Sequence, residues 1–191
     1  MDMTAANECF RRTVAALNQT GKPWFAQGGT LLGLWRDGQL MAHDKDLDFG
    51  LWVQDFDYSI HQAMAGQGLS IWLQKTWDSP HGRARLDAFH LDGKVSVDLI
   101  YWTSVDAGSS AFSMRQRPRE VVEYHFPRFQ GIDYWRSPLG WVQVPLAPEA
   151  WLNQAYGPDW VEPDPGWSNR NSPSTRRVFR DWENVTIQVG P

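Results

Sequence analysis

The acidic run at residues 44–50, Asp-Lys-Asp-Leu-Asp-Phe-Gly, is the feature that most constrains the fold of this chain. Residues 46–53 alternate like a β-strand, so Asp46 and Asp48 project from one face while Leu47 points into the core. Two carboxylates this close repel each other unless a cation lies between them. Oxygen ligands of this kind suit Mg²⁺ or Mn²⁺. The run therefore predicts a strand that carries a divalent-cation site.

A double glycine, Gly28-Gly29, precedes this strand and opens a short helix that begins at Thr30. Glycines allow backbone N–H groups to approach phosphate oxygens closely, and a helix start adds a favourable dipole. Arg36 lies one helical turn or more beyond, where its guanidinium could contact a phosphate oxygen through two N–H groups. The segment favours phosphate binding, with an ordinary tight turn and a surface arginine as the alternatives.

A third carboxylate, Asp98, interrupts an apolar strand with the sequence Val-Ser-Val-Asp-Leu-Ile-Tyr. An isolated buried charge is very costly, so this side chain needs a partner. A metal ion shared with Asp46 and Asp48 would satisfy all three carboxylates if the two strands are neighbours. An ion pair with Arg83 or Arg85 is the alternative for Asp98, and a solvated strand end is the alternative for the other two.

The order of predicted elements indicates an α+β fold with a mixed β-sheet flanked by helices. We expect helices at 4–19, capped by Thr4, and at 30–35, 58–65 and 148–156; strands at 24–26, 46–53 and 69–75; a hairpin at 83–91 and 94–102; a polar loop or short helix at 103–120; short strands within 121–146; irregular chain at 157–175; and an edge strand at 185–189.

The length of 191 residues favours one domain, here 1–191, with a core of about 5–165 and an irregular C-terminal tail. A net charge of −4 gives no general attraction to nucleic acid, and the single cysteine, Cys9, excludes an intrachain disulfide. We find neither a signal peptide nor a transmembrane segment, because no apolar run approaches the roughly 20 residues that span a bilayer. We expect a soluble, cytoplasmic protein.

Four segments together resemble the LicD/fukutin-related family of the nucleotidyltransferase-fold superfamily. They are Gly-Gly-Thr-Leu-Leu-Gly-Leu-Trp-Arg at 28–36, Asp-Lys-Asp-Leu-Asp-Phe-Gly at 44–50, Val-Asp-Leu at 97–99, and the segment 148–160 with its Tyr-Gly-Pro-Asp-Trp end. The resemblance implies a nucleotidyltransferase-like fold. It also implies metal-dependent transfer of phosphocholine or a polyol phosphate from a CDP-activated donor to the hydroxyl of a glycan or lipid-linked sugar, with release of CMP.

By the same resemblance, Asp46, Asp48 and Asp98 are the metal-binding and catalytic residues, and Mg²⁺ or Mn²⁺ is the cofactor. Gly28, Gly29, Thr30 and Arg36 are implied to bind the substrate. The family often has a tryptophan before an unbroken acidic triplet, whereas this chain has His43 and then Asp44-Lys45-Asp46. Whether His43 or Asp44 takes part is left open.

Two other functions use the same features. A nucleotidyltransferase would move NMP from an NTP to a small molecule or protein through the same three aspartates and release pyrophosphate. An inactive nucleotide-binding module would keep the fold without the chemistry. Two arginine groups, Arg115, Arg117 and Arg119 and then Arg170, Arg176 and Arg177, are either solvated loops or clamps for a donor or acceptor phosphate.

Overall fold

A computed structural model describes residues 1–105 and 108–190 of the chain. The helices are α1 (Met3–Gln19), α2 (Gly28–Leu32), α3 (Ser59–Gly66) and α4 (Pro148–Tyr156), and the π-helical turn η1 (Gly33–Asp37) continues α2. The strands are β1 (Phe25–Ala26), β2 (Asp46–Trp52), β3 (Leu69–Ser79), β4 (Gly82–Leu91), β5 (Val95–Val105), β6 (Gly108–Gln116), β7 (Arg119–Phe126), β8 (Ile132–Ser137), β9 (Gly140–Pro145), β10 (Thr175–Phe179) and β11 (Val185–Val189).

The described strands build one large mixed sheet and a separate hairpin. The sheet has the order β10-β7-β6-β5-β4-β3-β11, and β2 pairs with both β5 and β1. The pairing of β2 with β5 is parallel, whereas the other pairs of described strands are antiparallel. The expected α+β fold with a mixed sheet is confirmed, as are the hairpin of β4 with β5 and the edge strand β11.

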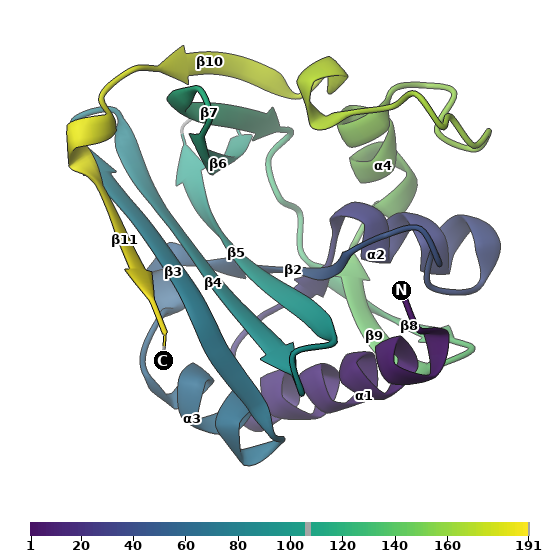
Figure 1. The fold of residues 1–191 in the computed structure, drawn as a ribbon. Helices are drawn as coiled ribbons and strands as arrows, with labels where there is room; N and C mark the ends of the chain where they lie inside the picture. The colour runs from purple at the N-terminus through teal and green to yellow at the C-terminus, as the bar shows by residue number, and fades with distance from the viewer. Residues whose placement is uncertain (106–107, 191) are drawn as a thin grey trace.

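Helices pack at two places around this sheet (Figure 1). α1 and α3 lie next to each other below the sheet, and α2 and α4 lie together beside the start of β2. The odd-numbered residues of β2 face the main core: the ring of Phe49 lies 5.8 Å from that of Phe10 in α1 and 5.7 Å from that of Trp24. This packing fixes β2 in the sheet and leaves its even-numbered residues on the opposite face.

α1 follows its predicted pattern with one difference at its start. Its apolar stripe is buried in the core, as the helical spacing predicts. The N-cap is Asp2 rather than Thr4, because Asp2 Oδ1 accepts hydrogen bonds from the backbone N–H groups of Thr4 at 2.9 Å and Ala5 at 3.3 Å. The prediction of Thr4 as the N-cap is therefore wrong, and aspartate caps helices at least as well as threonine.

The prediction of a polar loop or short helix at 103–120 is wrong, because this segment contains the end of β5, all of β6 and the start of β7. Its polar residues are compatible with a buried strand since they have partners. Ser110 is fully buried, and its hydroxyl donates to Glu123 Oε1 on β7 at 2.8 Å. β10 also begins within the tail, at Thr175, and pairs with β7.

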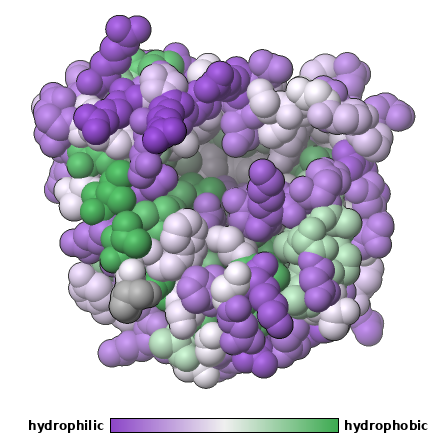
Figure 2. Space-filling model, in the orientation of Figure 1, coloured by the Kyte–Doolittle hydropathy of each residue, from purple (hydrophilic) through white to green (hydrophobic). Residues whose placement is uncertain are grey.

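No helix in the described part of the chain is both long enough and apolar enough to cross a membrane. The surface shown in Figure 2 is mostly hydrophilic, and it is hollowed between α2 and β6.

Candidate active site

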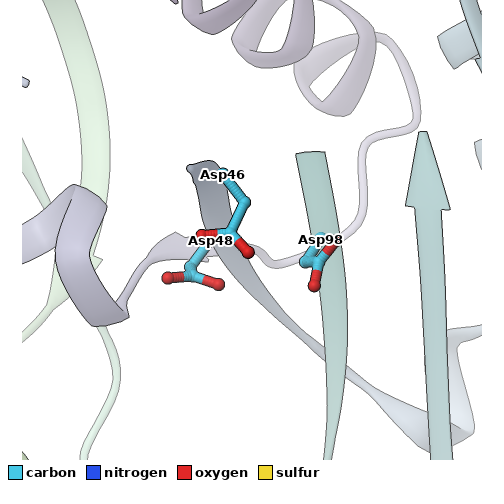
Figure 3. A group of neighbouring side chains, drawn as sticks. All are labelled: Asp46, Asp48 and Asp98. Carbon is cyan, nitrogen blue, oxygen red and sulfur yellow. The ribbon is translucent and has the colours of Figure 1, made fainter. Parts of the chain in front are cut away.

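Three carboxylates meet on one face of the β2–β5 pair (Figure 3). In the parallel register, Asp48 lies opposite Asp98, and Asp46 lies opposite Ser96. Each carboxylate offers one oxygen such that the three oxygens lie within 4.8 Å of one another. The prediction that the chain brings Asp98 beside the acidic strand is therefore confirmed.

The alternation of the two strands explains why these side chains share a face. Leu47 and Val97, which pair with each other one residue before the Asp48–Asp98 row, point the other way and are at most 1% exposed. The arginines considered as partners for Asp98 are engaged elsewhere: Arg83 pairs with Asp78, and Arg85 pairs with the buried Asp87. Asp98 instead accepts a long hydrogen bond of 3.5 Å from the hydroxyl of Ser96.

Burial and mutual repulsion raise the pKa values of all three clustered carboxyls. Burial raises the pKa of Asp98 to about 6, and the charge of Asp46 adds to the rise while Lys75 and Ser96 oppose it. Burial is also the main cause that raises the pKa of Asp48, followed by the charges of Asp46 and Asp98. A divalent cation would relieve this repulsion, and three carboxylate oxygens are the hard ligands that Mg²⁺ and Mn²⁺ favour. The donor set fits such an ion.

The double glycine gives these carboxylates room. Gly28 has a φ of +55°, which favours glycine, and a Cβ there would lie 2.9 Å from Asp48 Cγ. A Cβ on Gly29 would overlap the carboxylate of Asp44. The backbone amide of Gly29 lies against the Asp48 carboxylate and opposes the rise of its pKa. The turn thus supports the carboxylates directly, and its expected contact with phosphate stays a prediction.

Thr30 holds the acidic strand in place. Its side-chain hydroxyl accepts a hydrogen bond of 2.8 Å from the backbone N–H of Asp48, and Thr30 is only 2% exposed. The hydroxyl therefore fixes the position of β2 relative to α2. The contribution of Thr30 to substrate binding stays a prediction.

Arg36 lies in a different set of contacts from the three carboxylates. Its guanidinium pairs with Asp37 through two hydrogen bonds of 2.8 Å, and its Nη1 donates to the Trp160 carbonyl at 3.4 Å. The bonds to Asp37 raise the pKa of Arg36 and lower that of Asp37. Arg36 joins η1 to the chain that follows α4, and a role on phosphate stays a prediction.

Two further groups lie near the site: Asp44, whose participation the sequence left open, and Tyr156, which was not predicted. Asp44 lies close enough to raise the pKa values of Asp46 and Asp48, so a fourth carboxylate stands at the edge of the cluster. Tyr156, at the end of α4, stacks on Trp167 with ring centroids 4.5 Å apart. Its phenol has a raised pKa because it is buried and because Asp48 and Asp44 lie nearby. The signal for Asp44 was present as the first acidic residue of the run.

The two arginine groups come together around β7. Arg115 donates to Glu120 at 3.2 Å and to the Tyr124 hydroxyl at 2.6 Å, while Arg176 and Arg177 lie 3.8 and 3.9 Å from Glu123. These are contacts within the sheet. The expectation of a solvated loop does not describe Arg115, which lies on β6, whereas Arg117, Arg119 and Arg170 are exposed. A role on phosphate stays a prediction.

Comparison with known proteins places this site in a family. A family model described as LicD/FKTN/FKRP, nucleotidyltransferase domain, matches residues 21–128, which is more than half of the chain and contains all three clustered aspartates. Curated relatives described as ribitol-5-phosphate transferase FKTN from Macaca fascicularis and Homo sapiens are 24% identical over 170 residues, and that from Mus musculus is 24% identical over 175 residues.

These alignments cover 88% of the present chain and 36% of each relative, so the chain spans about a third of the length of the curated relatives it matches. The model match covers the double glycine, the acidic strand and Asp98 in one continuous range. By this match, the chain belongs to the LicD/FKTN/FKRP family.

Proposed function

We propose that this protein transfers a phospho-alcohol group from a CDP-activated donor to a sugar hydroxyl and releases CMP. The observation that carries the proposal is the cluster of Asp46, Asp48 and Asp98 beside the double glycine, in a chain of this family. The curated relatives are described as ribitol-5-phosphate transferases, which makes CDP-ribitol the first donor to test and CDP-choline the second. We also propose that the mixed sheet is a nucleotidyltransferase-like fold.

Asp46, Asp48 and Asp98 would hold one or two Mg²⁺ or Mn²⁺ ions. When bound, the cation neutralises charge on the donor diphosphate and on the leaving CMP. Asp98 would also accept the proton of the attacking hydroxyl, since a carboxylate that is ionised at neutral pH can act as a general base.

The reaction that these residues serve is a displacement at the phosphorus that carries the alcohol. The sugar oxygen forms a bond to this phosphorus, the bond from phosphorus to the CMP oxygen breaks, and the sugar hydroxyl proton moves to Asp98. Burial of the carboxylates strengthens their electrostatic interaction with bound groups because water screens them less. The acceptor would be a glycan or a lipid-linked sugar.

The released product tests this proposal. The purified protein is incubated with Mg²⁺ and separately with CDP-ribitol, CDP-choline, CTP and ATP, with a matched series in excess EDTA. We expect Mg²⁺-dependent release of CMP from a CDP-alcohol. Release of pyrophosphate from CTP or ATP would instead assign the same aspartates to nucleotidyl transfer, and binding of nucleotide without any product would indicate a binding module.

A further inference from the structure

Gln27 forms the first member of a row of polar side chains that crosses the site. It directly precedes α2, and its backbone N–H donates to the Asp48 carbonyl at 3.2 Å. In the antiparallel register of β1 with β2, Ala26 lies opposite Phe49, so the next residue, Gln27, lies opposite Asp48. Asp48 in turn lies opposite Asp98. Gln27, Asp48 and Asp98 therefore follow one another across the sheet on the same face.

The orientation of the Gln27 amide is fixed by a tryptophan. The Trp102 indole N–H, which can only donate, bonds to Gln27 Oε1 at 2.8 Å. Gln27 Nε2 is consequently the free end of the amide. It is buried and has no hydrogen-bond partner among the residues that the structure describes, and the whole residue is 4% exposed.

A buried N–H without a partner is costly, by about 1–3 kcal/mol. Trp102, which holds the other end of the amide, packs with Phe25, Phe126 and Trp151, at ring centroid distances between 4.9 and 6.3 Å. An apolar residue such as methionine would avoid this cost. A donor kept at this position, in the row of Asp48 and Asp98, can be completed by an oxygen of a bound ligand.

We propose that Gln27 Nε2 donates a hydrogen bond to a non-bridging oxygen of the phosphoryl group that is transferred, which makes Gln27 a substrate-positioning residue. The proposal rests on the proposed function. The carboxylates and their cation would hold the phosphoryl group at the Asp48–Asp98 pair, and Gln27 is the next side chain of the same row. Because the amide is neutral and already oriented, it adds a donor without adding a charge.

The decisive comparison is between two buried glutamines that pack against tryptophans. Gln27→Met removes the donor in the row. Gln143→Met makes the same change on β9, where the glutamine is 7% exposed and contacts Trp24. For Gln27→Met we expect kcat for CMP release from the CDP-alcohol to fall about 10²- to 10³-fold, the scale for loss of one transition-state donor, with a much smaller change in donor affinity by calorimetry. For Gln143→Met we expect kcat within about threefold of wild type.

A second measurement does not depend on turnover. The side-chain amide resonances of Gln27 are assigned in a ¹H–¹⁵N spectrum by their loss in Gln27→Met. We expect them to move on addition of the CDP-alcohol with Mg²⁺, while those of Gln143 stay in place. Melting curves of both variants show whether each remains folded.

Three results overturn the proposal: wild-type kcat in Gln27→Met, equal losses of kcat in both variants, or unmoved Gln27 resonances with ligand bound. A wild-type protein that binds CDP-alcohols but releases no CMP from any of them overturns the proposed function instead, and the phosphoryl assignment of Gln27 with it. Normal wild-type turnover with an unaffected Gln27→Met rejects the role of Gln27 alone.

Discussion

Asp48 and Asp98 lie directly opposite each other in the parallel pairing of β2 with β5. The register makes two carboxylates from distant parts of the chain immediate neighbours, and burial raises the pKa of both. The charge of Asp98 raises the pKa of Asp48, and the charge of Asp46 raises that of both. Without a cation this arrangement opposes folding at neutral pH, so its most direct physical explanation is a bound divalent ion.

Replacement of a carboxylate should separate activity from folding. We expect Asp46→Asn to abolish Mg²⁺-dependent CMP release, because one of the three oxygens that would hold the cation loses its charge. The loss should reach several orders of magnitude. The metal-free variant should melt at or above the wild-type temperature, because a repulsive charge has been removed. Calorimetric melting with an assay of CMP release tests both parts, and normal turnover would refute the assignment of Asp46.

The stability of the metal-free protein should depend on the ionisation of Asp98. Its pKa is about 6 in the folded state and 3.8 ordinarily, so protonated Asp98 favours folding below pH 4, and this contribution is lost as pH rises through 6. The Asp98→Asn variant has no ionisable group at this position. In EDTA we expect the variant to match wild type near pH 4 and to be more stable by about 3 kcal/mol above pH 7.

Urea unfolding of both proteins between pH 4 and 8 measures this difference. A constant difference across the whole range would show that ionised Asp98 is not destabilising in the fold. A less stable variant at pH 7 would show that the carboxylate has a favourable partner.

The glycine turn should be intolerant of a side chain. Gly28→Ala places a Cβ against the Asp48 carboxylate at a positive φ, which we expect to cost about 1–3 kcal/mol and to weaken Mn²⁺ binding. Gly66→Ala is the matched control, since a Cβ there meets nothing within 4 Å and its φ is not positive. Unfolding and Mn²⁺ titration of the two variants test the account, and equal behaviour would contradict it.

Arg36 offers a test of whether its contacts are structural alone. Arg36→Lys cannot retain the paired bonds to Asp37 and the bond to the Trp160 carbonyl, so we expect a loss of about 1–3 kcal/mol in urea unfolding. If Arg36 also binds the donor phosphate, the affinity of the Arg36→Lys variant for CDP should fall. Asp37→Asn leaves the guanidinium in place, so this variant should bind CDP at least as well as wild type. Unchanged CDP affinity in Arg36→Lys would exclude the phosphate role.

Local patterns were sufficient to predict how the three clustered carboxylates are oriented. Alternation predicted that Asp46 and Asp48 share a face opposite Leu47, and the apolar strand around Asp98 required a partner for that carboxylate. Those predictions depend on the period of a strand, which the sequence displays directly. The register that sets Asp98 opposite Asp48 rather than Asp46 depends on pairing between segments fifty residues apart, and no local pattern encodes it.

The features that the sequence did not predict also depend on contacts between distant segments of the chain. β6 resembled a loop because its serines are polar, and only the sheet shows that Ser110 has Glu123 as its partner. The sequence did not indicate a role for Gln27, because the orientation of its amide depends on a hydrogen bond from Trp102, which lies far along the chain. Arg36 was expected to contact a phosphate or to be a surface residue, yet the adjacent Asp37 could have suggested the ion pair.

Calorimetric titration with Mn²⁺ in the presence of CMP, at pH 7.5, is the most direct test of the three-carboxylate site. The account predicts saturable binding to wild type and a loss of at least about tenfold in affinity for each of Asp46→Asn, Asp48→Asn and Asp98→Asn, with all three variants folded. Binding of Mn²⁺ to the Asp98→Asn variant with wild-type affinity would contradict the claim that the two strands share one ion.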